Sequence, residues 1–262
     1  MTARPKRKLL VGTCGFIGSQ ARTFRELEIV EVQVTFYQPP APATAERWRR
    51  KAPEPFVFTL KAWQLVTHEA WSPTYRRLKE KLTAAALART GGFRWNEVTR
   101  MAWQRTQEIA EILGAEAIVF QTPRSFTPTR ESLGRMRRFF EGIDRKGRWV
   151  VFEPRGEAWR DDLMEKLIED LDLIHGVDPF IRLPVGETRP RYFRLSGRPA
   201  YTYRYVYTDD DLRDLEGWLS PDRPNRVLFN NDAMAHDAGR FLERLGLKPV
   251  QEGLDSLLRE SE

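Results

Sequence analysis

The sequence has little of what metal centres and disulfide scaffolds need: one cysteine, Cys14, and three histidines. A lone cysteine excludes a disulfide scaffold and a cysteine-based zinc cluster, and three histidines leave little for a multi-histidine metal site. Neither a Walker motif nor a G-x-G-x-x-G fingerprint occurs, so nothing supports an enzyme built around a nucleotide cofactor. We therefore expect no metal and no cofactor.

No apolar run approaches the ~18–20 residues that a transmembrane helix needs, so we expect no membrane partner. Charge of one sign is not in large excess either, since 43 Lys and Arg face 37 Asp and Glu, a net charge of +6. That balance favours anionic partners without naming one. The 262 residues, 41% of them hydrophobic, suffice to bury the core of one large domain.

The amino terminus allows two interpretations. A basic tail, residues 1–8, precedes an apolar run from Leu9 to Gly18 and the triplet Ser19-Gln20-Ala21, which together resemble a secretory signal peptide. Three glycines interrupt that run and would break up a signal helix. We favour a first strand over Leu9–Thr13 that enters a glycine-punctuated loop, and hence a cytoplasmic protein.

Short apolar runs alternate with segments of helical period along the rest of the chain. The expected strands are Leu9–Thr13, Ile29–Phe36, Phe56–Lys61, Ala117–Gln121, Trp149–Arg155, Leu171–His175, Tyr192–Ser196 and Val227–Asn230. The expected helices are Thr44–Lys51, Trp95–Leu113, Thr129–Glu141, Trp159–Asp170, Asp209–Leu219 and Ala233–Leu245. This alternation predicts an α/β fold, a (β/α)8 TIM-like barrel that forms a single domain over residues 1–262. A doubly wound open sheet is the alternative.

The segment from Glu69 to Arg94, after the third strand, does not follow that alternation. It is long and rich in Arg and Lys, and its pattern predicts an extra helix over Tyr75–Arg89. Long insertions between a strand and its helix often cover the active-site face of a barrel. The segment is therefore expected to be a helical insertion, either a lid over the site or a solvated charged helix.

Polar side chains alternate with apolar ones inside several expected strands. One face of each barrel strand packs on helices and must be apolar, so the polar residues of the other face should point inward. These residues are Glu31, Gln33, Tyr37, Lys61, Gln121, Glu153, Arg155, Arg194, Ser196, Asn230 and Asp232. Most stand near carboxyl-terminal strand ends, where barrel active sites lie. Because buried charges are costly unless paired, they indicate either a polar active site or an internal salt-bridge lattice without chemistry.

Ordered motifs from these strands resemble the YecE-like family, domain of unknown function 72. They are Glu31-Val-Gln-Val-Thr-Phe-Tyr37, Phe56-x-Phe58-x-x-Lys61 with Thr67-His68, Gln121-Thr-Pro123-x-Ser-Phe126, Phe152-Glu153-Pro-Arg155 with Trp159, Tyr192-x-Arg194-x-x-Gly197 and Phe229-Asn-Asn-Asp232. The resemblance spans nearly the whole chain, from Gly12 to about Leu245. It implies a TIM barrel of unestablished biochemical role with a polar pocket at the carboxyl-terminal strand ends.

The chain departs from the family pattern at three places. Gln33 stands where the family usually has Asn, and Ser196 stands where it usually has His. Pro154 replaces the Phe that often lies between the family's Glu and Arg, here Glu153 and Arg155. Any mechanism that relies on the family histidine is weakened in this chain.

The charged residues suggest specific chemistry. Glu31 and Glu153 are candidates for a general acid and base, because burial and a neighbouring cation move the pKa values of two carboxyls apart. Pairing of both with arginine, without chemistry, is the alternative. His68 is a candidate acid or base at the rim of the site. Lys61 would add to the acid/base set and, with arginines, would hold a phosphate or carboxylate.

Two functions follow. The first is an enzyme, a hydrolase or lyase, that acts by acid/base chemistry on a small anionic substrate, phosphorylated or sugar-like. The residues expected to bind it are Arg155, Arg194, Asn230 and Asn231, with Gln33, Tyr37, Gln121, Ser196 and Asp232 also lining the site. The alternative is a nucleic-acid-binding or nucleic-acid-processing barrel, suggested by the net charge, the Arg-rich insertion and the aromatic residues Trp63, Trp71, Tyr201, Tyr203 and Tyr205.

Overall fold

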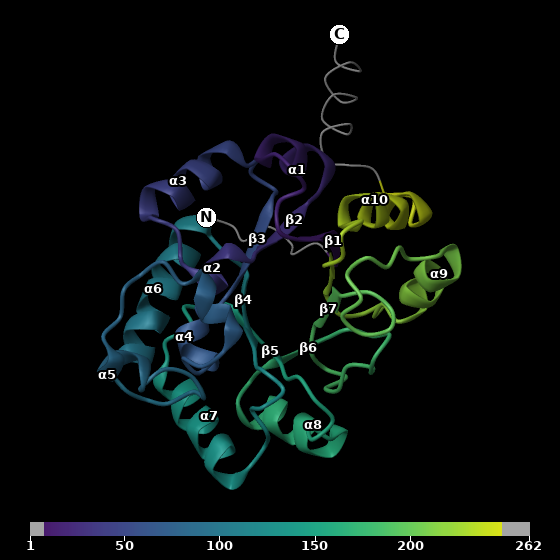
Figure 1. Cartoon of the computed structure of the whole chain (residues 1–262). Helices are drawn as coiled ribbons and strands as arrows, with labels where there is room; N and C mark the ends of the chain where they lie inside the picture. The colour runs from purple at the N-terminus through teal and green to yellow at the C-terminus, as the bar shows by residue number, and fades with distance from the viewer. Residues whose placement is uncertain (1–7, 248–262) are drawn as a thin grey trace. The chain divides into compact units, whose positions relative to one another are not determined.

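Eight strands close into a parallel barrel in the order in which they occur along the chain, with helices between consecutive strands except the sixth and the seventh (Figure 1). The computed structural model describes residues 8–247. The predicted (β/α)8 barrel is therefore confirmed, and the doubly wound open sheet is excluded. Of the predicted basic tail, residues 1–7 lie outside the described residues.

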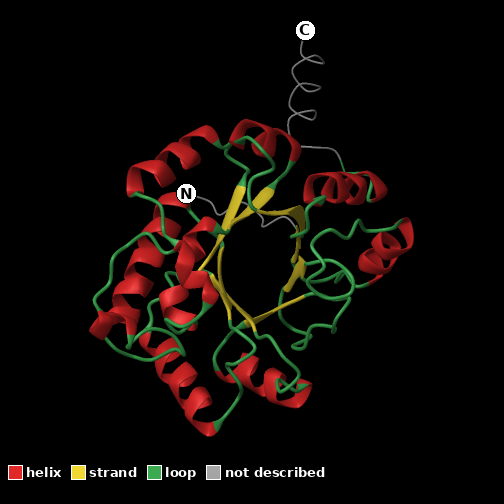
Figure 2. Ribbon diagram, in the orientation of Figure 1, coloured by secondary structure: helices red, strands yellow, loops and turns green. Residues whose placement is uncertain are grey.

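The strands and helices are coloured separately in Figure 2. The strands are β1 (Leu9–Cys14), β2 (Ile29–Val32), β3 (Val57–Lys61), β4 (Ala117–Gln121), β5 (Trp149–Glu153), β6 (Ile174–Val177), β7 (Arg191–Leu195) and β8 (Asn225–Phe229). The helices are α1 (Gln20–Glu26), α2 (Val34–Tyr37), α3 (Pro42–Lys51), α4 (Gln64–Thr67), α5 (Ala84–Leu87), α6 (Glu97–Leu113), α7 (Arg130–Gly142), α8 (Asp161–Asp170), α9 (Asp209–Gly217) and α10 (Met234–Arg244), with a 3-10 helix, η1 (Pro73–Arg77).

Contacts between residues divide the chain into two compact units. Within the described range, the first unit consists of residues 8–31, 51–57 and 176–247, and the second of residues 32–50 and 58–175. The expectation of a single domain stays a prediction. No helix of residues 8–247 is long and apolar enough to cross a membrane.

In the second unit, aromatic residues make the core behind β4. The rings of Phe93, Phe120, Phe139 and Phe140 pack with their centroids 5.2–6.0 Å apart. Phe120 belongs to β4, Phe139 and Phe140 belong to α7, and Phe93 lies at the carboxyl end of the insertion. Burying an aromatic side chain contributes about 2–3 kcal/mol, so this cluster anchors the insertion to the barrel wall.

In the first unit, alternate residues of β7 pack into an apolar cluster. Phe193 and Leu195 lie in this cluster together with Phe229 of β8 and Phe241 of α10. Because strand side chains alternate in direction, Arg194 points to the opposite face. The principle used to predict inward polar residues therefore holds for this strand.

Several predicted boundaries are wrong by a few residues. The second strand ends at Val32 rather than Phe36, because Val34–Tyr37 forms the helical turn α2, and Val34 is 45% exposed. The fifth strand ends at Glu153, which leaves Arg155 two residues beyond it. The sixth strand is Ile174–Val177, three residues later at its start than predicted. Ser196 and Asn230 likewise follow the ends of β7 and β8 rather than lying within them.

The predicted helix Tyr75–Arg89 does not form. The insertion instead contains the short 3-10 helix η1 and the four-residue helix α5, with irregular backbone around them. Its carboxyl end is held against α4, since the backbone N–H groups of Gly91, Gly92 and Phe93 donate to Leu65, Thr67 and Val66 respectively. The backbone φ angles of Gly91, Gly92 and Phe93 are +78°, +58° and +55°. A Cβ at position 91 would lie 2.5 Å from the backbone nitrogen of Glu69, so glycine is required there.

Candidate active site

Lys61, Gln121 and Glu153 form a buried series at the carboxyl ends of β3, β4 and β5. Lys61 Nζ donates to Gln121 Oε1 at 3.1 Å, and Gln121 Nε2 donates to Glu153 Oε1 at 2.6 Å. The strand register produces this arrangement, because Gln121 pairs directly with Glu153. All three side chains are less than a tenth exposed. The structure thus brings together three of the residues predicted for the site.

An aromatic ring also contacts the Lys61 ammonium. Its Nζ lies 4.0 Å from the centroid of the Phe36 ring, a favourable cation–π distance. Phe36 belongs to the helical turn α2, and Thr35 Oγ1 anchors that turn 2.7 Å from the carbonyl oxygen of Lys61. The turn that replaces the end of the second strand therefore places the ring on the ammonium.

His68 follows α4 and lies in the same region of the second unit. Its ring packs edge-on to Phe36 at 4.9 Å, and its Nδ1 lies 2.8 Å from Thr67 Oγ1. Burial, together with the nearby positive charges of Lys61 and Arg155, lowers the pKa of His68 to about 3. The imidazole is therefore neutral near pH 7. A neutral ring is a hydrogen-bonding group rather than a general acid there, which restricts the role predicted for His68.

Gln33, Tyr37 and Arg155 lie less deeply than predicted. Gln33 is the residue before α2, and Tyr37 is its last residue, so neither lies on a strand; all three are half-buried. The Tyr37 ring is covered by the Arg77 guanidinium, 3.5 Å from the ring centroid. Arg155 is close enough to His68 to influence its pKa.

In the first unit, Glu31 is held by Arg194 and Tyr192. Arg194 donates Nε to Glu31 Oε2 at 2.9 Å and Nη2 to Oε1 at 2.7 Å, and the Tyr192 hydroxyl lies 3.2 Å from Oε2. The Arg194 and Glu31 side chains are 2% and 0% exposed. A bidentate buried pair fixes the position of the carboxylate.

Asp178 is a buried acid that the sequence did not single out. It follows β6 and accepts hydrogen bonds from the backbone N–H and the hydroxyl of Ser196 at 2.9 and 3.0 Å. Its other oxygen accepts from the backbone N–H of Phe180 at 3.1 Å. The Ser196 hydroxyl is therefore oriented by a carboxylate. The predicted sixth strand, Leu171–His175, ends three residues before Asp178. With the observed strand end at Val177, Asp178 is a polar residue directly after a strand, which is the pattern that predicts a site residue.

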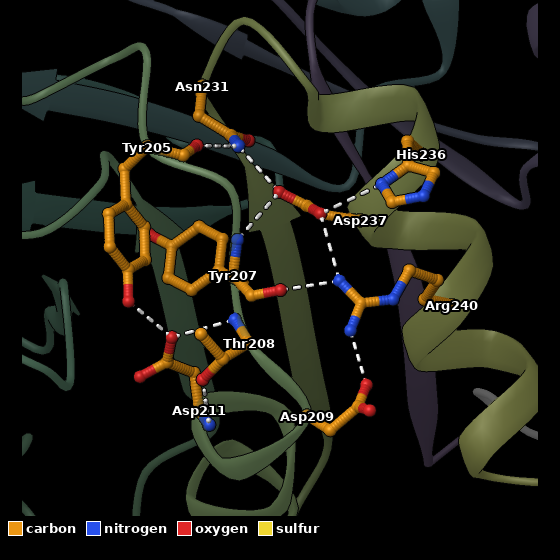
Figure 3. A network of polar contacts seen from close by, with 9 residues as sticks. All are labelled: Tyr205, Tyr207, Thr208, Asp209, Asp211, Asn231, His236, Asp237 and Arg240. Atoms are coloured by element: carbon orange, nitrogen blue, oxygen red, sulfur yellow. Dashed lines mark hydrogen bonds and ion pairs between the residues drawn. The ribbon is translucent and has the colours of Figure 1, made fainter.

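A second polar network follows β8 in the first unit (Figure 3). The buried carboxylate of Asp237 accepts from Asn231 Nδ2 at 2.6 Å and from the backbone N–H of Tyr207 at 3.3 Å, and it pairs with Arg240 at 3.5 Å. Asn231 also donates to the carbonyl of Tyr205 at 2.8 Å. Asn231 thus holds the loop before α9 against α10.

The remaining predicted residues after β8 differ in exposure. Asn230 is half-buried, and its backbone N–H donates to the carbonyl of Leu195 at 2.7 Å. Asp232 is exposed, and its backbone N–H donates to Tyr203. Among residues 8–247, no group of three or more His, Cys, Asp or Glu side chains could hold a metal ion. The predicted residues thus form one series in the second unit, whereas in the first unit the Glu31–Arg194 pair, Ser196 and Asn231 belong to separate contacts.

The chain is similar to proteins of known structure. A DUF72 family protein from Enterococcus faecalis superposes with a TM-score of 0.70 at 15% identity, covering 92% of this chain and 96% of that one. A DUF72 family protein from Thermotoga maritima gives 0.67 at 20% identity, covering 92% and 100%. A D-psicose 3-epimerase, crystallised in the presence of D-fructose, gives 0.52 at 11% identity, covering 86% and 90%. At these identities the likeness is one of fold.

Sequence comparison identifies the family. None of the curated proteins compared with the chain matches it. The model of the family described as "Protein of unknown function DUF72" matches residues 21–258, which is most of the chain and agrees with the resemblance seen in its strand-end motifs. The chain therefore belongs to the DUF72 family.

Proposed function

We propose that this protein is an enzyme that transfers a proton to or from a small anionic substrate, phosphorylated or sugar-like, as a lyase or a related enzyme does. The observation that carries the proposal is the buried series Lys61–Gln121–Glu153, in which a cation and a carboxylate are fixed by one amide. Buried charges are costly, and a barrel core needs none. A carboxylate can take a proton from carbon, and an ammonium and a neutral imidazole can stabilise the negative charge that results.

Glu153 is the proposed base. Its Oε1 accepts from an amide, which orients the carboxylate without neutralising its charge as a proton would. Removal of a proton from a carbon next to a carbonyl leaves negative charge on the carbonyl oxygen. The proton is then on Glu153, and the substrate is an enolate that needs stabilisation.

Lys61 and His68 are the groups proposed to stabilise that enolate. The Lys61 ammonium supplies positive charge, and the neutral His68 ring can donate a hydrogen bond from Nε2 when the Thr67 hydroxyl donates to Nδ1. Arg155 adds a positive charge beside His68 and is the proposed partner of a phosphate or carboxylate on the substrate. Glu31, paired with Arg194, is proposed to position Arg194 rather than to take a proton.

The experiment that tests the proposal follows carbon-bound protons in D2O. The fold likeness to a D-psicose 3-epimerase makes ketoses and ketose phosphates the first panel, and loss of a proton signal next to the carbonyl reports exchange. Glu153→Gln should slow exchange by about 10²- to 10⁴-fold. Glu157→Gln, which changes an exposed carboxylate four residues later, is the matched control and should leave the rate unchanged. Exchange that survives in Glu153→Gln would contradict the assignment.

Nucleic-acid binding is a second candidate, favoured by one observation. Trp71, in the Arg-rich insertion, is 67% exposed and therefore available for stacking on a base. Trp63 is fully buried and is excluded from that role. Titration of single- and double-stranded oligonucleotides at about 50 and 200 mM salt tests it, because binding through phosphates weakens steeply as salt is added.

A further inference from the structure

A cavity of about 250 Å³ lies between the insertion and the segment that follows β4. The insertion contributes residues of the stretch 69–73 and Gly92, and the other wall comes from residues 123–126 and from α7. Pockets for drug-sized ligands measure about 300–1,000 Å³. A cavity of this size therefore suits a ligand of about one ring.

Two walls of this cavity are apolar. Trp71, 67% exposed, is fixed by a hydrogen bond from its Nε1 to Glu69 Oε2 at 2.7 Å. Pro73, Pro123 and Phe126 add further apolar surface. An exposed indole that is oriented by a hydrogen bond offers a flat face to a ring, and it loses less conformational entropy when a ligand binds than a free side chain does.

Hydroxyls and a guanidinium surround these walls. The polar lining consists of Thr67, Glu69, Ser72, Ser125, Ser132 and Arg135, and the Glu69 carboxylate is paired with Arg94. A serine hydroxyl both donates and accepts hydrogen bonds, so a set of them matches a ligand that carries hydroxyls. A sugar ring has an apolar face of C–H groups and hydroxyls around its edge, so it complements an aromatic wall that is surrounded by hydroxyls.

Arg135 supplies positive charge that a ligand can use. Its partner on α7 is Glu131, whose side chain is 73% exposed, and an exposed pair at this spacing contributes little. The guanidinium can therefore exchange this partner for an anion on a ligand. The other arginine nearby, Arg94, is held by Glu69 at 2.6 Å and by the carbonyl oxygen of Thr90 at 2.5 Å.

The cavity adjoins the candidate active site through Thr67. This residue lines the cavity, and its Oγ1 lies 2.8 Å from His68 Nδ1. Pro123, in the opposite wall, follows Gln121 by two residues. Thr67 therefore belongs both to the cavity lining and to the surroundings of the His68 imidazole.

We infer that this cavity binds a sugar ring with an anionic substituent: the ring lies on Trp71, its hydroxyls meet the serines, and the anion pairs with Arg135. The inference rests on the proposed function and names the part of the substrate that does not react. It makes two residues determinants of specificity: Trp71, in an insertion that the sequence showed only as charged, and Arg135 of α7.

The test measures binding by the full chain with calorimetry and ligand-observed NMR. The probes are D-glucose, D-glucose 6-phosphate, D-glucuronate, AMP and inorganic phosphate. We expect the two anionic sugars to bind with Kd on the order of 1 mM or tighter, and their ring protons to receive saturation from the protein. Trp71→Ala should weaken both by about tenfold or more, and Trp71→Phe should retain most of the affinity.

Arg135→Met should weaken the anionic sugars and leave D-glucose unchanged. The matched control is Arg137→Met, on the same helix, whose partners Glu141 and Asp170 lie outside the cavity lining. Failure of both anionic sugars to bind, unchanged affinity in Trp71→Ala, or inorganic phosphate binding as tightly as the sugars would overturn the inference. So would tighter binding of AMP, which would instead support the nucleic-acid alternative.

The same variants separate this inference from the proposed function. Glu153→Gln should keep sugar binding while losing proton exchange. If Trp71→Ala leaves sugar affinity intact while Glu153→Gln abolishes exchange, the sugar subsite is wrong and the proposed function stands. If Trp71→Ala abolishes binding but no exchange occurs in the unchanged protein, the subsite stands and the proposed function is wrong.

Discussion

Arg194 and Glu31 face each other as a bidentate pair, with N–O distances of 2.9 and 2.7 Å and almost no exposure of either side chain. Replacing both partners of such a pair with apolar groups is often tolerated, whereas removing one leaves an uncompensated buried charge. At this pair, a substitution of one partner should therefore lower the free energy of unfolding, whereas a substitution of both partners by apolar residues should not.

Arg194→Met should lower the free energy of unfolding by about 3–5 kcal/mol, because it leaves the Glu31 carboxylate buried without its principal partner. Urea denaturation measures this. The control is Arg213→Met, since Arg213 pairs with Asp210 on the surface with side chains 62% and 80% exposed. That change should cost less than about 1 kcal/mol. The double variant Glu31→Leu/Arg194→Met should recover stability, because no buried charge is then left unpaired. Equal losses in Arg194→Met and the control would contradict the prediction.

Gln121→Leu should cost about 1–3 kcal/mol of stability, because it removes an acceptor from Lys61 and a donor from Glu153 inside the barrel. Gln107→Leu is the matched control, since Gln107 makes one exposed bond to the carbonyl of Asp144. Chemical denaturation of both variants provides the comparison. If Gln121→Leu lowers the free energy of unfolding no more than the control does, the hydrogen bonds of Gln121 to Lys61 and Glu153 do not stabilise the fold.

Stability should fall as the pH is lowered below about 6.5, because unfolded His68 binds a proton there and folded His68, with a pKa near 3, does not. The contribution is fully present above pH 6.5 and declines by up to about 1.4 kcal/mol per pH unit below it. Between pH 6.5 and 5, His68→Gln should show a shallower decline than the unchanged protein. The His68 ring NMR signals should also stay constant over this range, and a titration near pH 6.5 would refute the burial argument.

Asp237→Ala should increase hydrogen exchange at the Tyr207 amide by about tenfold or more, because the carboxylate accepts from that N–H and from Asn231 (Figure 3). Asp232→Ala, which changes an exposed carboxylate near the start of the same helix, is the control and should leave that amide unchanged. Mass spectrometry of the peptide that spans Tyr205–Thr208 provides the measurement. Unchanged exchange would mean that Tyr207 is protected by packing alone.

Much of the fold follows from alternation that one sequence displays. β4 has the predicted bounds Ala117–Gln121, and its neighbour β5 begins at the predicted Trp149, because compact apolar runs there end at polar residues. The inward direction of Lys61, Gln121, Glu153 and Arg194 follows from the same period of two. These are positions where local pattern and barrel geometry agree.

Other features depend on contacts that a pattern does not contain. Val34 and Phe36 continue the alternation of β2, but the chain turns into α2 there, and Phe36 packs on Lys61 and His68 instead. The segment around β6 reads Leu173-Ile-His-Gly-Val177, without a clean alternation of apolar and polar residues, so the sequence does not fix where this strand ends and does not point to Asp178. Tyr192 is not among the predicted site residues, although its hydroxyl lies 3.2 Å from Glu31 Oε2.

Gln121 has a consequence for the direction in which protons can travel. Its carbonyl oxygen accepts from Lys61 while its amide nitrogen donates to Glu153, and rotating the amide would set two donors against each other at Lys61. An amide does not give up its protons near neutral pH, so this bridge transmits polarisation but is closed to proton hopping. In the proposed mechanism, a proton taken up by Glu153 therefore does not pass to Lys61 through Gln121. Lys61 would then stay protonated throughout a turnover, and it would act through its positive charge rather than as a proton donor or acceptor.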